Sequence, residues 1–282
     1  MRLQHHDIQS FYDRTQDYLL QHEAEHNLLL NLSHTLLHRP DRYPNPPYLV
    51  TVEQGNELTA VALRTPPHDL VLSKVRNLSA LTLIAEDVQQ TQKDLPGVSG
   101  LVEESRVFMN IWQTLTGQSF RLNMDMRIHQ LTTVNPVTHV NGHLRLATPS
   151  DRSLLIQWNE AFQKEVSLLL KEDTERVVDG ALERQTAYVW EDSHPVSFAF
   201  GGRSRPTMGR IGPVYTPPEY RRNGYAMACV AHLSQRLLDQ GCQHCYLFTD
   251  IANPTSNHIY QTIGYRPVCD WSDYTLIDRA TS

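Results

Sequence analysis

A short run of residues late in the chain has the composition of an anion-binding turn. Arg221-Arg222-Asn223-Gly224-Tyr225-Ala226 follows a predicted strand, Gly209–Thr216, and opens a predicted helix that ends at Asp239. Such a junction points several backbone N–H groups one way, and the helix start adds a partial positive charge. Gly224 allows close approach of a phosphate, and the arginines add charge. The run predicts a pyrophosphate site; an ordinary loop with a helix-starting glycine is the alternative.

A second group of polar residues surrounds the start of the next predicted helix, Thr255–Thr262. Asn253 lies at the mouth of this helix, and Ser256 and Tyr260 are four positions apart, so they share one helix face. A phenol there could donate a proton to a leaving thiolate. The alternative is a capping Asn and a half-buried core Tyr. Gly264-Tyr265 then ends the helix and begins a strand.

Taken together and in this order, these motifs resemble those of the GNAT superfamily of N-acetyltransferases. The family's pyrophosphate loop, R/Q-x-x-G-x-G/A, corresponds to Arg221–Ala226. Its later Asn, followed by a Tyr and then by Gly-aromatic, corresponds to Asn253, Tyr260 and Gly264-Tyr265. The resemblance covers the second half of the chain.

The resemblance implies an acetyl-CoA-dependent N-acetyltransferase that acts on a primary amine (a small amine, an amino acid or a peptide N-terminus) by direct attack and without a metal. Tyr260 would protonate the departing coenzyme A thiolate, and a backbone N–H near Val214 would hold the developing oxyanion. The positions expected to bind the coenzyme are Val214, Tyr215, Thr216, Arg221, Arg222, Asn223, Gly224, Tyr225, Ala226, Met227, Asn253 and Ser256.

The general base is the least specified part of the predicted site. Some relatives carry a Glu on the strand before the Asn, and Phe248 occupies that position here. Four side chains remain open as substitutes: Glu191, Asp192, His194 and Asp250. Because the strand Glu is missing, a non-catalytic acyl-CoA-binding sensor or scaffold remains the alternative function.

The predicted elements occur in the same order twice: two helices, three strands, helix, strand, helix, strand. We therefore expect an α/β fold of tandem GNAT-like domains, each a mixed, mostly antiparallel sheet flanked by helices. The expected ranges are 1–134 for a degenerate domain and 141–282 for the acetyl-CoA-binding catalytic domain. The first half reads Lys74-Val75-Arg76-Asn77-Leu78-Ser79-Ala80 at the equivalent turn, without a glycine.

Composition narrows the class of protein further. The chain has 282 residues and a net charge of −6, which disfavours a nucleic-acid partner. We expect no membrane span and no signal peptide, and the four cysteines, all after position 228, are typical of a reducing cytoplasm. Cys242 and Cys245 lack the second ligand pair that a zinc site needs. Acetyl-CoA and an amine acceptor are the expected partners, with a monomer or homodimer both open.

Overall fold

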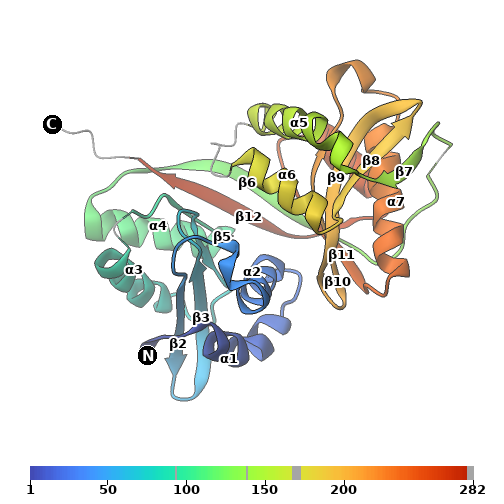
Figure 1. The fold of residues 1–282 in the computed structure, drawn as a ribbon. Coiled ribbons are helices and arrows are strands. Elements are labelled where there is room, and N and C mark those ends of the chain that lie inside the picture. Colours follow the sequence, from blue (N-terminus) through green and yellow to red (C-terminus); the bar gives the residue numbers. More distant parts are fainter. Residues whose placement is uncertain (93, 138, 167–172, 278–282) are drawn as a thin grey trace. The chain divides into compact units, whose positions relative to one another are not determined.

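The computed structural model describes residues 1–92, 94–137, 139–166 and 173–277, and its path is shown in Figure 1. By contacts the chain separates into two compact units. Unit 1 contains Met1–Ile128, Asp250–Ala252 and Val268–Ser282, and unit 2 contains His129–Thr249 and Asn253–Pro267. Lys93, Thr138 and residues 278–282, which fall within the expected domains and linker, lie outside the described residues.

Unit 1 is a mostly antiparallel sheet flanked by helices. Antiparallel pairs join β1 to β2, β2 to β3, β3 to β4 and β5 to β12, while β4 and β5 are parallel. Its elements are β1 (Arg2–His5), α1 (Ile8–Leu20), α2 (Asn27–His38), a 3₁₀ turn (Pro40–Arg42), β2 (Tyr48–Gln54), β3 (Glu57–Arg64), β4 (Leu70–Leu72), α3 (Ala80–Thr91), β5 (Gly97–Leu101), α4 (Val102–Thr116), and most of β6 (Phe120–Leu131) and β12 (Arg266–Leu276).

Unit 2 repeats this order of elements. Antiparallel pairs join β7 to β8, β8 to β9 and β9 to β10, and β10 is parallel to β11. Its elements are β7 (His143–Leu146), a 3₁₀ turn (Pro149–Asp151), α5 (Arg152–Glu165), α6 (Thr174–Glu183), β8 (Ala187–Asp192), β9 (His194–Arg205), β10 (Met208–Tyr215), a 3₁₀ turn (Pro218–Tyr220), α7 (Tyr225–Asp239), β11 (His244–Asp250) and α8 (Pro254–Ile263). The expected tandem α/β arrangement is confirmed.

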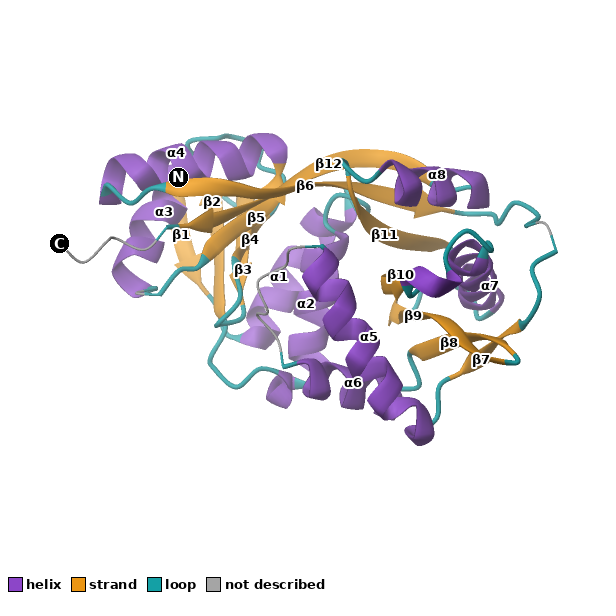
Figure 2. Cartoon of the chain, turned by 90° about the horizontal axis from the view of Figure 1, so that it is seen from above, coloured by secondary structure: helices purple, strands orange, loops and turns teal. Residues whose placement is uncertain are grey.

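The sheet of unit 2 has an apolar core on each face, as expected for a layered α/β fold. Tyr188, Trp190 and Ile211 pack with α7 on one face, while Val189, Phe198 and Tyr215 pack with α5 and α6 on the other. Figure 2 shows α7 and the α5–α6 pair on opposite sides of the strands. Successive residues of each strand thus pack against helices on opposite faces of the sheet.

The ends of the two units differ from the ranges expected from sequence. Residues 268–276 of β12 lie in unit 1 because Trp271–Thr275 pair with β5 in the register Trp271↔Leu101 to Thr275↔Gly97. The indole Nε1 of Trp271 also donates to Ser99 Oγ at 2.6 Å. Removing these pairs would expose the buried side chains of Trp271, Tyr274 and Leu276.

The segment between β6 and β7, residues 132–142, forms no helix or strand in its described part. It is nevertheless attached to unit 2, because Asn135 donates its backbone N–H to Ile263 O at 2.7 Å and its side-chain amide to Thr262 O at 3.1 Å. Val137 and Val140 pack against the core beside α7. Among all helices in the described ranges, none is long and apolar enough to cross a bilayer.

Candidate functional site

The junction between β10 and α7 has the backbone shape that the loop motif predicts. Gly224 is the N-cap of α7 with φ of 79°, a left-handed conformation in which a side chain is strained. A Cβ added there would lie 3.1 Å from Val140 Cγ2. Arg222 also has a positive φ, of 67°. These two residues turn the chain sharply from the strand into the helix.

Six consecutive backbone N–H groups at this junction, those of Arg222 to Met227, have no acceptor among the described residues. The first regular bond of the helix is Ala228 N–H to Gly224 O at 3.0 Å. No side chain caps the helix, and residues 222–227 are exposed or partly exposed. Helix-start amides normally have a partner, so this run of donors is open to an anionic ligand.

Neighbouring side chains brace the loop from behind and leave its amides open. Asn223 Nδ2 donates to Tyr220 O at 3.1 Å, across the turn. Tyr225 Oη donates to Asp192 Oδ2 at 2.6 Å, which raises the pKa of the phenol. The rings of His194 and Tyr220 lie 5.3 Å apart. The side chains of Asn223 and Tyr225 therefore hold the turn, and their backbone N–H groups are without an acceptor among the described residues.

The two adjacent arginines differ in their contacts. Arg221 Nη2 donates to both carboxylate oxygens of Glu165, at 2.7 and 2.8 Å, and its Nε donates to Thr216 O at 2.9 Å. Arg222 is exposed and makes no hydrogen bond or ion pair with a described residue. Glu165, at the end of α5, was not anticipated from the sequence, since it lies 56 positions from Arg221.

Strand β10 is paired unequally along its two edges. Its register with β11 covers only Met208 to Arg210, whereas its register with β9 continues to Tyr215. The β11-facing edge of the Val214–Tyr215 segment thus has no strand partner among the described pairs. Thr216 Oγ1 donates to Ser197 Oγ at 2.8 Å, on the β9 side. An extended ligand could add to the open edge as a further strand.

Helix α8 carries the second motif. Asn253 caps the helix, because its side-chain oxygen accepts the Ser256 N–H at 3.0 Å. Its side-chain NH₂ donates to no described residue and is exposed. Asn253 therefore acts as the helix cap that the alternative interpretation predicted. Its side-chain NH₂ group is still able to donate to a ligand. Ser256 is partly buried one turn before Tyr260.

Tyr260 is half-buried and packs on the core that contains Cys229 of α7. Burial, and secondarily the nearby Cys229 thiol, raise the pKa of the Tyr260 phenol. Its ring meets that of Tyr265 edge-on at 6.0 Å, and Tyr265 Oη is fixed 2.9 Å from Ser234 Oγ. The phenol therefore remains protonated at neutral pH, as a proton donor must.

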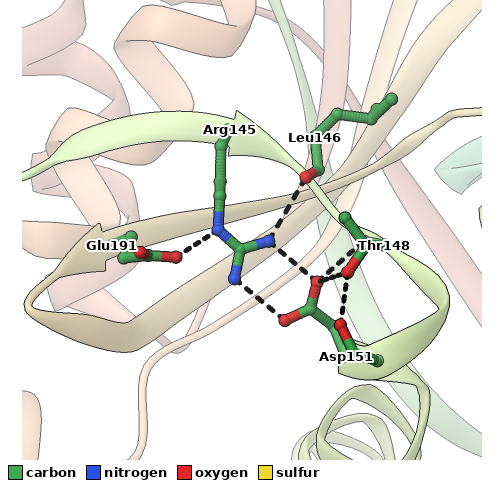
Figure 3. A network of polar contacts seen from close by, with 6 residues as sticks. Arg145, Leu146, Thr148, Asp151 and Glu191 are labelled. Atoms are coloured by element: carbon green, nitrogen blue, oxygen red, sulfur yellow. Dashed lines mark hydrogen bonds and ion pairs between the residues drawn. The ribbon is translucent and has the colours of Figure 1, made fainter.

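Three of the four candidate bases lie around the β8–β9 turn, beside the loop. Glu191 is held by an ion pair with Arg145, whose guanidinium also binds Asp151 at 2.8 and 2.9 Å (Figure 3). That network lowers the pKa of Asp151 to about 2. Asp192 accepts from Tyr225, and the His194 ring contacts the Tyr220 ring at a tilt of 60°. Asp192 and His194 thus contact residues of the loop and of the turn before it, whereas Glu191 is paired with Arg145 of β7.

The fourth candidate base, Asp250, lies at the end of β11, and Phe248 lies two positions before it on the same strand. Asp250 Oδ1 accepts the backbone N–H of Ala252 at 2.8 Å, so this carboxylate caps the turn after β11. Phe248, where relatives carry a Glu, lies under the Arg210 guanidinium at 5.4 Å. Within the described ranges no three His, Cys, Asp or Glu side chains come together as metal ligands.

Comparisons with known proteins identify the fold of the chain. Residues 193–274 match the family model described as FR47-like protein. A GCN5-related N-acetyltransferase from Sphaerobacter thermophilus superposes with a TM-score of 0.62 at 13% identity, over 100% of this chain and 98% of that one. A tandem GNAT protein from the clavulanic acid biosynthesis pathway gives 0.60 at 9% identity, over 99% of both chains. The chain has the tandem GNAT fold.

A Drosophila protein of solved structure also has this architecture, with a TM-score of 0.73 at 10% identity over 98% of both chains. No curated protein matches the chain by sequence. The likeness is therefore one of fold, and the roles of individual residues depend on the geometry of this chain.

The first GNAT unit provides an internal comparison at its own β4–α3 junction. Six backbone N–H groups there are occupied: Lys74 by His26 Nε2 at 3.0 Å, Val75 by Glu104 Oε1 at 3.1 Å, Arg76 by Thr59 O at 2.9 Å, and Ser79, Ala80 and Leu81 within the turn at 3.0 Å. His26 and Glu104 are buried. In unit 1, side chains and backbone carbonyls together accept six N–H groups of this junction, whereas in unit 2 the N–H groups of Arg222 to Met227 have no acceptor among the described residues.

Proposed function

We propose that unit 2 binds acetyl-CoA at the β10–α7 junction and transfers its acetyl group to a primary amine. The observation that carries this proposal is the run of six N–H groups, from Arg222 to Met227, that have no acceptor among the described residues. At the counterpart junction in unit 1, six N–H groups have acceptors. A diphosphate supplies the acceptors that these donors lack. Arg222 adds a positive charge beside them.

The remaining coenzyme contacts follow the course of β10. Past Arg210 this strand has an open edge, where the pantetheine arm would hydrogen-bond to the backbone of Val214, Tyr215 and Thr216. The NH₂ group of Asn253, left over from its capping bond, is a further donor for the arm. Ser256 lies one turn further along α8, on the Tyr260 face.

The transfer itself needs an uncharged amine, because an ammonium has no lone pair. The amine nitrogen forms a bond to the thioester carbon, the carbon–sulfur bond breaks, and Tyr260 gives its proton to the departing thiolate. The Tyr260 phenol is protonated at neutral pH, because burial raises its pKa further above 7, and it regains a proton from solvent after the transfer. The proton lost by the amine leaves to a base or to solvent.

The fold supports the same reaction class, since solved proteins that share it are named as N-acetyltransferases. Six N–H groups of the unit 1 junction already have acceptors within the protein, so we expect one coenzyme per chain, bound by unit 2. All four cysteines are free thiols, the state that a reducing cytoplasm maintains, and we place the activity there.

The deciding experiment offers the full chain acetyl-CoA and a panel of amines while free thiol is measured. Amine-dependent thiol release, with calorimetric binding of one coenzyme A per chain, is the expected result. Binding without release for any amine would favour a sensor or scaffold. Absence of binding would reject the junction as a coenzyme site.

A further inference from the structure

The contacts of Arg221 set it apart from the arginine beside it. Its guanidinium reaches three places at once: the Glu165 carboxylate, the Thr216 carbonyl and the face of the Tyr215 ring, 5.7 Å from its centre. Tyr215 Oη in turn donates to Glu165 Oε1 at 3.3 Å. These contacts connect the end of β10, the loop and the end of α5.

The positive charge of Arg221 is paired with a negative charge within the protein, that of Glu165. Both carboxylate oxygens of Glu165 accept from a single guanidinium nitrogen, so the opposite charges largely compensate. The Nε bond to Thr216 O holds the guanidinium against the strand end from which the loop departs. Arg222 has a positive φ and an exposed side chain, and its guanidinium makes no hydrogen bond or ion pair within the part of the chain that the structure describes.

We propose that Arg221 and Glu165 are positioning residues for the coenzyme loop, and that Arg222 alone supplies the arginine charge to the coenzyme phosphates. This inference rests on the proposed function of the junction. The pair fixes where the chain leaves β10, and that exit determines the direction of the six free N–H groups. A donor array is effective only when it is held in place before the ligand arrives.

Exposure allows a positioning role to be separated from a role in folding. The side chains of Arg221 and Glu165 are 43% and 45% exposed, and ion pairs this exposed add little to global stability. Loss of the pair should therefore weaken coenzyme binding while leaving the unfolding midpoint in place.

The test compares variants of the full chain by calorimetry with coenzyme A at low and high salt. Glu165→Gln and Arg221→Lys should each raise Kd about fivefold, which corresponds to about 1 kcal/mol. Lys keeps the charge but not the planar fork, so it cannot replace Arg221 in this role. Arg222→Gln should raise Kd and reduce its salt dependence, because it removes a screened charge contact.

Glu160→Gln is the matched control, since it removes the same charge from an exposed position on α5. It should leave Kd unchanged. In the acetyl-transfer assay the Glu165 variant should raise KM for acetyl-CoA and leave kcat near the wild-type value, whereas a general loss of structure would lower both the unfolding midpoint and kcat.

Three results would overturn the inference. Tighter binding by Glu165→Gln would mean that Arg221, once released, is itself a phosphate ligand. Wild-type affinity in that variant, or in Arg221→Lys, would mean that the pair does not position the loop. Absence of coenzyme A binding by the wild-type protein would instead reject the proposed function itself, whatever the variants do.

Discussion

His26 makes the stability of unit 1 sensitive to acid. The side chain is 1% exposed, its Nδ1 lies 2.9 Å from Leu19 O, and its Nε2 accepts the Lys74 N–H at 3.0 Å. The carbonyl requires the proton on Nδ1, so Nε2 carries the lone pair. A second proton on Nε2 would face the Lys74 N–H, and burial would leave the new charge without solvent. Burial accordingly lowers the pKa of His26 from 6.5 to about 4.

The sign and size of the effect follow from this shift. Between pH 6.5 and about 4 the unfolded chain binds the proton and the folded chain does not, so stability falls as the pH falls. The contribution is complete above pH 6.5 and is lost by about pH 4. At 1.36 kcal/mol per pKa unit, the loss is about 3 kcal/mol.

The assay is urea unfolding of wild type and His26→Gln between pH 7.5 and 4.5, with His26 titrated by NMR. Gln keeps an acceptor for Lys74 but cannot take a proton, so the wild type should lose more stability than the variant as the pH falls. His22→Gln, at a neighbouring and more exposed histidine, should keep the wild-type dependence. Parallel pH profiles for wild type and His26→Gln, or a His26 pKa near 6.5, would refute the reasoning.

Three further substitutions test other parts of the structure. Tyr260→Phe should lower kcat by about 100-fold or more and leave coenzyme A affinity unchanged, as expected for a lost proton donor; equal losses in both would indicate packing alone. Gly224→Val should abolish coenzyme binding, because a β-branched residue is strained at φ of 79° and its Cβ would lie 3.1 Å from Val140 Cγ2. Wild-type affinity of this variant in calorimetry would contradict the loop assignment. Gly97→Ala should lower the free energy of unfolding of unit 1 by at least about 2 kcal/mol in urea, since the new Cβ would clash with Tyr274 O across the β5–β12 pair. An unchanged urea unfolding midpoint would argue against that pairing.

The sequence was sufficient to predict features that depend on local spacing. The order of elements in both halves and the loop before α7 follow from hydrophobic periodicity and from the positions of glycine and proline. The helix-starting conformation of Gly224 follows from the same signals. Local sequence patterns in each half of the chain were therefore enough to predict the tandem GNAT fold, which the structure confirms.

Long-range contacts account for what the sequence did not predict. The pairing of Trp271 with β5 joins residues about 170 positions apart, and no local pattern specifies that register. Glu165 is one of many acidic residues until the fold brings it to Arg221. The open amides of unit 2 were predicted from the loop motif, but the contacts of Arg221 that distinguish it from Arg222 were not, because they depend on the fold.

The path of the chain through its two units has a consequence for biosynthesis. β5 is synthesised in the first half of translation, whereas its partner β12 follows nearly all of unit 2 along the chain. The paired residues are about 170 positions apart, so at about 5 to 20 residues per second β5 is without that partner for roughly 8 to 35 s. During this interval the incomplete unit presents unpaired backbone groups and an uncovered apolar surface, the kind of surface that molecular chaperones recognise.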